Sequence, residues 1–323
     1  MYLQDNNIFF YCQTVIFKYN CGMEPKSVLA FDIDGTLTKR NTYNILPEGL
    51  ATVLNALSKA GHYFLPVTGK PIAYVSRLIQ TNHLTDRGII AENAGVYRKP
   101  ESETIEIFEK ESVKAICELK EMLGLVPSAG NICDVFIEGR IHKMPVDPED
   151  HSILTLFTDP KFISHRWQFE QTITTEEVFD FLQKIVQDKW DDQLKVIPPF
   201  PDGGIQVIRK THTGRIIDKS LIVDVIKIMF EMTEMPPIAM FGDGHNDVPA
   251  MTPKEVTAIT FSNAHPLLID FVKNKKGYIS QSPAPDNYGT VEGLYWLVKT
   301  NFFKEDSNLV KRILDNTFKD RFS

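Results

Sequence analysis

The sequence has few cysteines, no long apolar run and no excess of basic residues. Its four cysteines, Cys12, Cys21, Cys117 and Cys133, form no C-x-x-C pair, so they indicate neither a zinc site nor a redox dithiol. Four thiols in a chain of 323 residues are typical of free cysteines in a reducing compartment. We therefore expect a cytoplasmic protein.

No uninterrupted apolar run approaches the roughly 20 residues that a membrane-spanning helix needs. Residues 1–25 are apolar and aromatic in their middle, but they lack a basic start and carry Asp5, so we expect an extension and not a signal peptide. Met23 is an alternative start, because the first clear strand follows it. The net charge of −7 argues against nucleic acid as a partner, since binding a phosphate backbone requires a basic surface.

Several common enzyme motifs are also absent. The sequence has no G-x-x-x-x-G-K-[ST] phosphate loop and no G-x-S-x-G nucleophile turn. The segment "GDGHND" is close to a dinucleotide-binding glycine pattern, but Asp247 stands where the third glycine is required. These absences argue against a P-loop enzyme, a serine hydrolase and a dinucleotide-binding enzyme.

The sequence does contain alternating short apolar runs and amphipathic helices. Strands are predicted at 27–31 and 88–93, and residues 63–71 are predicted to be a strand that runs into a turn. A helix is predicted within 46–62, and Pro71 is well placed to open a second helix. This order is typical of an α/β fold with a doubly wound, mostly parallel sheet. Ligands of such sheets bind at the carboxyl ends of the strands.

The pattern changes in the middle of the chain. Amphipathic strands at 103–109 and 131–139 and helices at 112–123 and 174–190 predict an inserted α+β domain. The Pro/Gly-rich segment 197–204 is predicted to be a hinge or linker. We expect an N-terminal extension (1–25), a core domain (26–96 and 204–300), an inserted domain (97–203) and a C-terminal helical tail (301–323).

Asp32 and Asp34 stand one residue apart at the end of the first predicted strand, in "LAFDIDGTLTKR". Residues two apart in an extended strand point the same way, so we expect both carboxylates over the ligand crevice. Their repulsion requires a cation or a shared proton. Mg²⁺ meets that need because it binds a few carboxylates together with substrate phosphate. Asp243 and Asp247 follow another predicted strand and supply further carboxylates.

The segments "DIDGT", "VTGK", a lysine ahead of a helix, and "GDGHND", in that order, resemble the four motifs of the haloacid dehalogenase superfamily. The inserted domain between the second and third motifs resembles a C2-type cap. The T-G-K form of the second motif and the "AEN" after the next strand resemble the C2B-capped, Cof-like branch. The resemblance implies a Rossmann-like core and a phosphatase that acts on small molecules.

The resemblance also implies residue roles. Asp32 would attack phosphorus as the nucleophile, and Asp34 would act as general acid and then general base. Thr68 and the backbone near Gly69 would hold phosphate oxygens, and Lys70 would be a charge on the phosphate side or the surface.

The same resemblance implies the metal site. Mg²⁺ would bind the Asp32 carboxylate, the Asp34 backbone carbonyl and Asp243. Asn246 and Asp247 would orient the metal's waters, the phosphate or the lysine.

The catalytic lysine has two candidates. Lys219 stands at a predicted helix start, although Ser220 replaces the glycine that usually follows. Lys210 is the alternative. We prefer Lys219 because of its place at the helix start.

Substrate recognition is assigned to the inserted domain. Its basic segments hold Arg140, His142 and Lys143, and then Arg166 and Trp167. We select Arg140 as a substrate-binding residue, with an ordinary solvated turn as the alternative. His245 is expected to be a loop histidine near the site and not a metal ligand.

We therefore expect a Mg²⁺-dependent phosphomonoester hydrolase that acts on a small phosphorylated metabolite, with a sugar phosphate as the first choice. One alternative is a sugar phosphomutase of the phosphomannomutase kind. Another is a non-catalytic binding protein on the same fold. The aromatic C-terminal segment is expected to form closing helices that dock on the core. Self-association into a homo-oligomer through this segment is the alternative.

Overall fold

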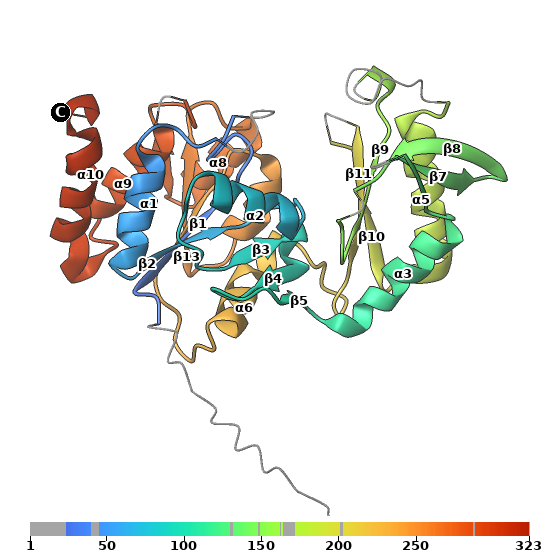
Figure 1. Cartoon of the computed structure of the whole chain (residues 1–323), viewed down its shortest axis with the longest axis horizontal. Coiled ribbons are helices and arrows are strands. Elements are labelled where there is room, and N and C mark those ends of the chain that lie inside the picture. Colours follow the sequence, from blue (N-terminus) through green and yellow to red (C-terminus); the bar gives the residue numbers. More distant parts are fainter. Residues whose placement is uncertain are drawn as a thin grey trace, which may run out of the picture.

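The computed structural model describes residues 24–39, 45–129, 132–147, 149–161, 163, 172–200, 203–286 and 288–322. Its core is a five-stranded parallel sheet of order β14-β13-β12-β1-β2 (Figure 1). The strands are β1 (Ser27–Phe31), β2 (His62–Pro66), β12 (Ile238–Phe241), β13 (Val256–Phe261) and β14 (Tyr278–Ser280). The prediction of a doubly wound, parallel sheet is confirmed.

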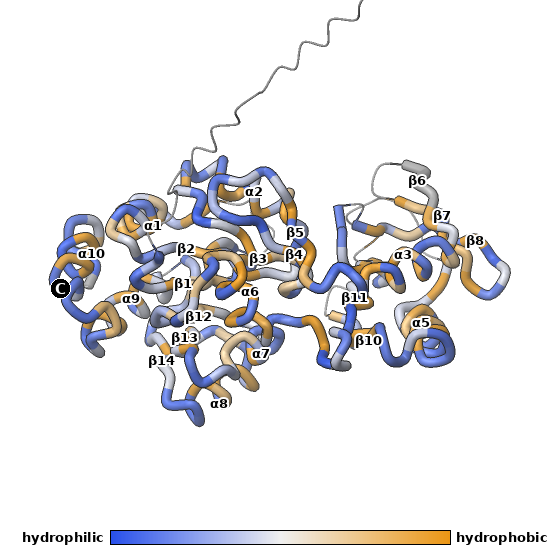
Figure 2. Tube along the Cα trace, turned by 90° about the horizontal axis from the view of Figure 1, so that it is seen from below, coloured by the Kyte–Doolittle hydropathy of each residue, from blue (hydrophilic) through white to orange (hydrophobic). Residues whose placement is uncertain are grey.

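Helices cover both faces of this sheet, which is why its central strands are apolar throughout (Figure 2). Alternate side chains of β1 show the two faces. Leu29 and Phe31 belong to the same cluster as α1, α2, α9 and α10, whereas Val28 and Ala30 pack with α6, α7 and α8. The helices are α1 (Leu50–Lys59), α2 (Ile72–Thr81), α6 (Ile222–Met229), α7 (Val248–Met251), α8 (Pro266–Asn274), α9 (Gly289–Lys299) and α10 (Ser307–Phe322).

The C-terminal helix is part of the core packing, as the aromatic sequence predicted. On α10, Val310, Leu314 and Phe318 are buried in the cluster that also contains α1 and α9. Their spacing of four residues places all three on one face of the helix. None of the helices in the described ranges is long and apolar enough to cross a membrane.

Truncation of Leu314 to alanine is expected to lower the free energy of unfolding by about 2–5 kcal/mol, because it removes a buried side chain from this interface. The matched control is Asn316→Ala, which changes an exposed residue on the same helix and should shift stability by less than about 0.5 kcal/mol. Urea unfolding of the full chain measures both values. Equal midpoints for the two variants would mean that α10 does not stabilise the core.

A small antiparallel sheet, β3-β4-β5, borders the core. Its strands are β3 (Ile89–Ala91), β4 (Val96–Arg98) and β5 (Ile105–Ile107). A bridge between Val67 and Ile90 joins it to the chain after β2, and Ile105 and Ile107 pack against the core. Residues 97–108, which the sequence placed in the inserted domain, therefore pack with the core.

In the residues that the structure describes, two antiparallel sheets of the inserted domain pack against the helices α3 and α5 (Figure 1). The sheets have the orders β6-β7-β8 and β10-β11-β9. The helix α5 begins with a capping box formed by Thr174 and Glu177. The elements are α3 (Val113–Met122), β6 (Val126–Ala129), β7 (Ile132–Ile137), β8 (Arg140–Pro145), β9 (Leu154–Phe157), α5 (Thr175–Trp190), β10 (Leu194–Ile197) and β11 (Gly204–Arg209).

Two details of the predicted domain division are wrong. We expected Gly204–Arg209 to resume the core sheet, but β11 pairs antiparallel with β10 and β9. The segment 197–204, predicted to be a hinge or linker, connects β10 to β11 within one sheet, and the Phe200 N–H donates to the Gly204 carbonyl. Every residue of β11 is buried, so its sequence resembles that of a core strand. The N-terminal extension up to Met23, and also Arg166 and Trp167, lie outside the described residues.

Candidate active site

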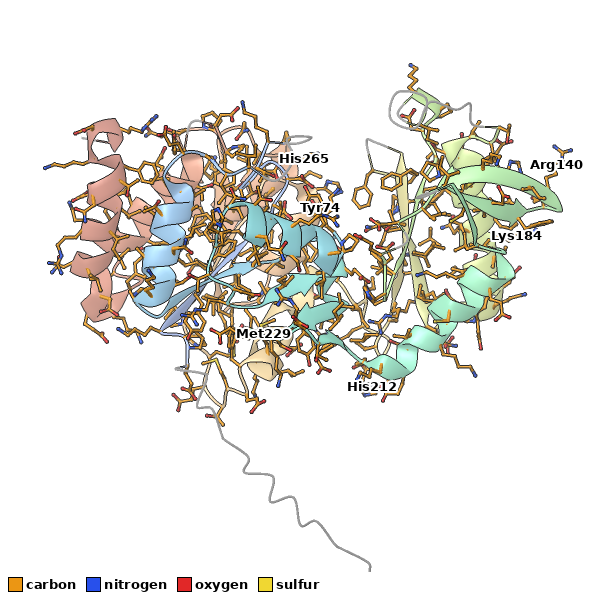
Figure 3. The ribbon with its side chains drawn as sticks, in the orientation of Figure 1. Tyr74, Arg140, Lys184, His212, Met229 and His265 are labelled. Carbon is orange, nitrogen blue, oxygen red and sulfur yellow. The ribbon has the colours of Figure 1, made fainter. Side chains whose placement is uncertain are left out.

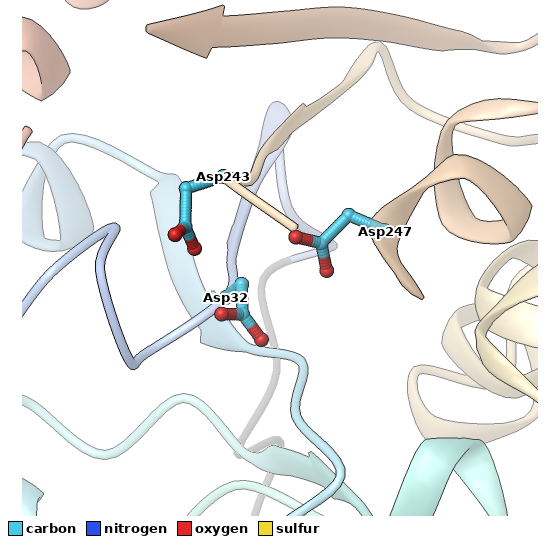
Figure 4. A group of neighbouring side chains, drawn as sticks. All are labelled: Asp32, Asp243 and Asp247. Carbon is cyan, nitrogen blue, oxygen red and sulfur yellow. The ribbon is translucent and has the colours of Figure 1, made fainter. Parts of the chain in front are cut away.

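Three carboxylates meet at the carboxyl ends of two neighbouring strands. Asp32 follows β1 and Asp243 follows β12, and the Asp32 backbone N–H donates to the Phe241 carbonyl at 2.9 Å, which joins the two strand ends. Asp247 lies in the short helical turn after Asp243. One oxygen of each carboxylate lies within 4.8 Å of the others, and all three residues are buried (Figure 4). We call Asp32, Asp243 and Asp247 the acidic cluster.

Lys219 is the cation of this cluster. It begins the helical turn that leads into α6, where Asp218 caps the turn by accepting the Ser220 N–H. Its Nζ donates to Asp32 Oδ1 at 2.7 Å and to Asp247 Oδ1 at 2.6 Å, and the side chain is only 1% exposed. The rival Lys210 donates to the Asp191 backbone carbonyl in the inserted domain. The geometry therefore favours Lys219.

The electrostatics of the cluster explain what it would bind. Burial and the nearby Asp247 carboxylate raise the pKa of Asp32 to about 8 in the metal-free protein, against the opposing effect of Lys219. Burial alone would lower the pKa of Lys219, but Asp247 and Asp32 together raise it, so the lysine is charged. Even with a proton on Asp32, one ammonium faces the two carboxylates of Asp243 and Asp247, which leaves an excess of negative charge that a divalent cation would neutralise.

Gly35 makes room for this arrangement. Its φ of +91° is favourable only for glycine, and a Cβ atom here would lie 2.3 Å from Asp243 Oδ2. Thr36 Oγ1 donates weakly to Asp243 Oδ1 at 3.4 Å. Buried oxygen donors on a rigid strand end, with surplus negative charge, fit Mg²⁺.

The Asp34 carboxylate is not part of the acidic cluster and contacts other side chains. The strand β1 ends at Phe31, so residues beyond it no longer alternate as in an extended strand. The Asp34 carboxylate instead accepts a long hydrogen bond from Tyr74 Oη at 3.4 Å and lies 3.4 Å from Lys70 Nζ. Its side chain is 29% exposed, so it is open to a ligand, whereas Asp32 is buried.

The T-G-K turn lies on the Asp34 side of the site, where Lys70 contacts Asp34. Thr68 is buried, and its Oγ1 accepts the Lys70 backbone N–H at 3.2 Å. The hydroxyl proton of Thr68 can still be donated to a ligand oxygen. Gly69 permits close approach here, because a Cβ atom would lie 3.0 Å from Asn93 Oδ1.

The structure does not bring every predicted residue to the site. Figure 3 places Arg140 at the tip of β8, at the far end of the inserted domain from the core. The selection of Arg140 as a substrate-binding residue is therefore not supported, because the β7–β8 hairpin projects outward. Asn246 and His245 are exposed after Asp243, and the His245 ring faces His265 with ring centroids 5.2 Å apart.

Sequence reasoning missed Tyr74, Glu92 and Asn93. Tyr74 lies in the first turn of α2 and carries no motif of its own. The "AEN" segment containing Glu92 and Asn93 was used only as a mark of the Cof-like branch. Its proximity to the T-G-K turn depends on backbone geometry that the sequence pattern does not encode.

Comparison with known proteins identifies the family. The family model described as haloacid dehalogenase-like hydrolase matches residues 29–277. No protein of curated function is similar enough to count as a match.

Three solved structures share the fold. A haloacid dehalogenase-like hydrolase from Bacteroides thetaiotaomicron is 15% identical, with a TM-score of 0.55 over 89% of this chain and 99% of that chain. TM0651 from Thermotoga maritima is 18% identical, with a TM-score of 0.53 over 78% of this chain and 91% of that chain. The subclass IIB sugar phosphatase BT4131 is 19% identical, with a TM-score of 0.50 over 86% of this chain and 99% of that chain.

The core sheet, the cap inserted after the T-G-K turn and the family match agree with one another. The chain belongs to the haloacid dehalogenase-like hydrolases, and it shares with the solved structures above the fold of a parallel core with an inserted cap.

Proposed function

We propose that the protein is a Mg²⁺-dependent phosphomonoester hydrolase that works through an aspartyl-phosphate intermediate. The observation that carries this proposal is the position of Asp32. Its carboxylate lies at a strand end, bonded to the buried ammonium of Lys219 and grouped with Asp243 and Asp247. A nucleophile held beside a buried cation suits attack on a phosphate ester, whose negative charge would otherwise repel a carboxylate.

The chemistry divides between the two aspartates. An Asp32 oxygen attacks phosphorus and the bond from phosphorus to the leaving oxygen breaks, while Asp34 gives that oxygen a proton. Asp34, now ionised, then removes a proton from water as the water oxygen attacks the aspartyl phosphate. Inorganic phosphate leaves and Asp32 is regenerated. The exposed position of Asp34 next to Tyr74 and Lys70 supports a role on the leaving-group side.

The remaining residues would bind and neutralise the phosphoryl group. Thr68, the backbone at Gly69 and Lys70 would hold its oxygens, and Lys219 would balance the charge that spreads over them. Asp247 bonds to Lys219 and to the Gly244 N–H at 3.0 Å, so it would orient the lysine.

Metal binding would use the same strand ends. The Asp32 and Asp243 carboxylates and the Asp34 carbonyl would hold Mg²⁺, with Asn246 and Asp247 beside it. When bound, Mg²⁺ would neutralise the acidic cluster and the substrate phosphate.

The substrate proposed is a small phosphorylated metabolite, with a sugar phosphate as the first choice. The T-G-K turn and the acidic cluster form one side of the site, and the antiparallel sheet of the inserted domain lies against the core at β11. A domain placed there would contact the leaving group of the substrate and not its phosphate. The name of BT4131 describes it as a sugar phosphatase, which is consistent with this choice.

Phosphate release from p-nitrophenyl phosphate tests the proposal. We expect release in Mg²⁺ and a loss of at least about 100-fold in EDTA, because the cluster would then carry uncompensated negative charge. Re-addition of Mg²⁺ to the same sample controls for irreversible unfolding. Full activity in EDTA would contradict the metal dependence. No release from p-nitrophenyl phosphate or from a panel of sugar phosphates would contradict the hydrolase.

A further inference from the structure

A left-handed turn, Glu92–Ala94, lies between the T-G-K turn and the inserted domain. Glu92, Asn93 and Ala94 have φ values of 48°, 55° and 70°. Three consecutive non-glycine residues in this conformation are unfavourable and persist only where the surroundings hold them. Such strain is concentrated at functional sites, so its contacts require an explanation.

The backbone of this turn holds the T-G-K turn. The Glu92 N–H donates to the Lys70 carbonyl at 3.1 Å, and the Asn93 N–H donates to the Thr68 carbonyl at 3.0 Å. The Asn93 side chain lies over Gly69, where its Oδ1 would be 3.0 Å from a Cβ atom. The segment proposed to bind phosphate is therefore fixed at both of its outer carbonyls and covered at its centre.

The Glu92 side chain holds the inserted domain. It is fully buried and accepts the backbone N–H groups of His151 at 2.9 Å and Ser152 at 2.6 Å. Burial alone would raise the pKa of Glu92, but the hydrogen bonds from His151 and Ser152 lower it, so the carboxylate is ionised. The loop before β9 is thereby bound to the core.

Arg209 completes this junction. The side chain is 1% exposed, and it donates to the carbonyls of Ser152 and Gly95, each at 3.0 Å. It also donates to the carbonyls of Phe108 and Glu109, where the chain leaves the core. The two connections of the inserted domain are thus joined to each other and to the left-handed turn.

One side-chain contact crosses directly from the turn to the cap sheet. Asn93 Nδ2 donates to Gln206 Oε1 of β11 at 2.9 Å, and Gln206 Nε2 donates to Thr155 Oγ1 of β9 at 3.3 Å. The oxygen and the nitrogen of the Gln206 amide are therefore both hydrogen-bonded within the protein. Gln206 therefore links the inserted domain to the core and is not a substrate-binding group.

We propose that Asn93 is a positioning residue that couples the placement of the inserted domain to the phosphate-binding turn. Its backbone fixes Thr68, its side chain covers Gly69, and its amide bonds to Gln206. With the inserted domain seated on the core, this contact holds the T-G-K turn in the form proposed to bind phosphate. The inference rests on the proposed function, because it takes that turn as the phosphate site.

A double-mutant cycle of Asn93→Gly and Gln206→Ala tests the coupling. Glycine keeps the left-handed backbone and removes only the amide. We expect each single variant to raise both the KM for p-nitrophenyl phosphate and the Kd for inorganic phosphate by about 10-fold in Mg²⁺, and the double variant to be no worse than either. A merely structural role would reduce the active fraction and lower kcat without changing KM or Kd. Gln193→Ala, an exposed amide beside β10, is the control.

Each outcome decides the matter. Unchanged KM and Kd in Asn93→Gly, or additive effects in the double variant, would overturn the coupling. If the wild type binds phosphate but hydrolyses no substrate, the proposed function is wrong. The coupling is then tested by the Kd values for inorganic phosphate in the double-mutant cycle. If the wild type does not bind phosphate in Mg²⁺, this inference is overturned as well.

Discussion

Asp32→Asn is expected to lower the kcat for p-nitrophenyl phosphate by at least about 10⁴-fold, because the amide cannot form the covalent intermediate. The substitution preserves shape, and the amide can still bond to Lys219 through its oxygen. Phosphate release in Mg²⁺ measures the effect. Asp34→Asn offers a matched comparison, since p-nitrophenolate leaves without a proton. That variant should still be phosphorylated, and mass spectrometry should find the phosphate on the Asp32 peptide.

The stability of Asp32→Asn separates lost chemistry from lost structure. In the metal-free protein, burial and Asp247 raise the pKa of Asp32 to about 8, well above its unfolded value. A carboxyl with a raised pKa loses stabilising free energy as the pH rises toward that value, so its ionised form destabilises the fold at alkaline pH. In EDTA above pH 8, the variant should therefore be at least as stable as the wild type. An active variant, or an inactive one that is unfolded, would not support Asp32 as the nucleophile.

Lys219→Met is expected to reduce both activity and stability. Loss of the ammonium should lower kcat by about 10²–10³-fold, because the charge on the transferring group is no longer balanced. It should also lower the free energy of unfolding in EDTA by about 3–5 kcal/mol, because Asp32 and Asp247 remain buried without their partner. Mg²⁺ should restore part of the stability and little of the activity. Chemical denaturation with and without Mg²⁺ measures the stability of the variant. Phosphate release from p-nitrophenyl phosphate measures its activity.

Lys210→Met is the control, because the sequence offers both lysines for the same role. The Lys210 ammonium donates to the Asp191 carbonyl and not to a member of the acidic cluster, so this variant should retain nearly full activity. If Lys210→Met were inactive and Lys219→Met active, the assignment of the catalytic lysine would be reversed.

The strand ends could be predicted because their signals are local. An apolar run followed by Asp32, and another followed by Asp243, marks two buried parallel strands, and adjacent parallel strands bring their carboxyl ends together. Lys219 could be preferred over Lys210 from its place at a helix start, where Asp218 caps the turn. Each of these features depends on a few neighbouring residues.

The remaining features depend on contacts between segments far apart in the sequence. In β11, Ile205 and Val207 pack with the helices of the inserted domain, and Gln206 bonds to Asn93 of the core. The strand is therefore buried throughout, as a central parallel strand is. Arginine is a common substrate-binding residue, which is why Arg140 was a candidate. The direction of the β7–β8 hairpin decides what Arg140 contacts, and the local sequence does not encode that direction. No residue in Glu92–Ala94 is a glycine that would have marked the left-handed turn.

The inserted domain leaves the core at Glu109 and returns at Arg209, and these two points are hydrogen-bonded neighbours. Glu109 also accepts the His212 N–H at 2.8 Å, and Figure 3 labels His212. An insertion whose ends meet can be exchanged as one cassette, since its replacement reroutes no core strand. Under the proposed function, exchange of this one continuous gene segment would alter leaving-group preference and leave in place the aspartates proposed to act on the phosphate.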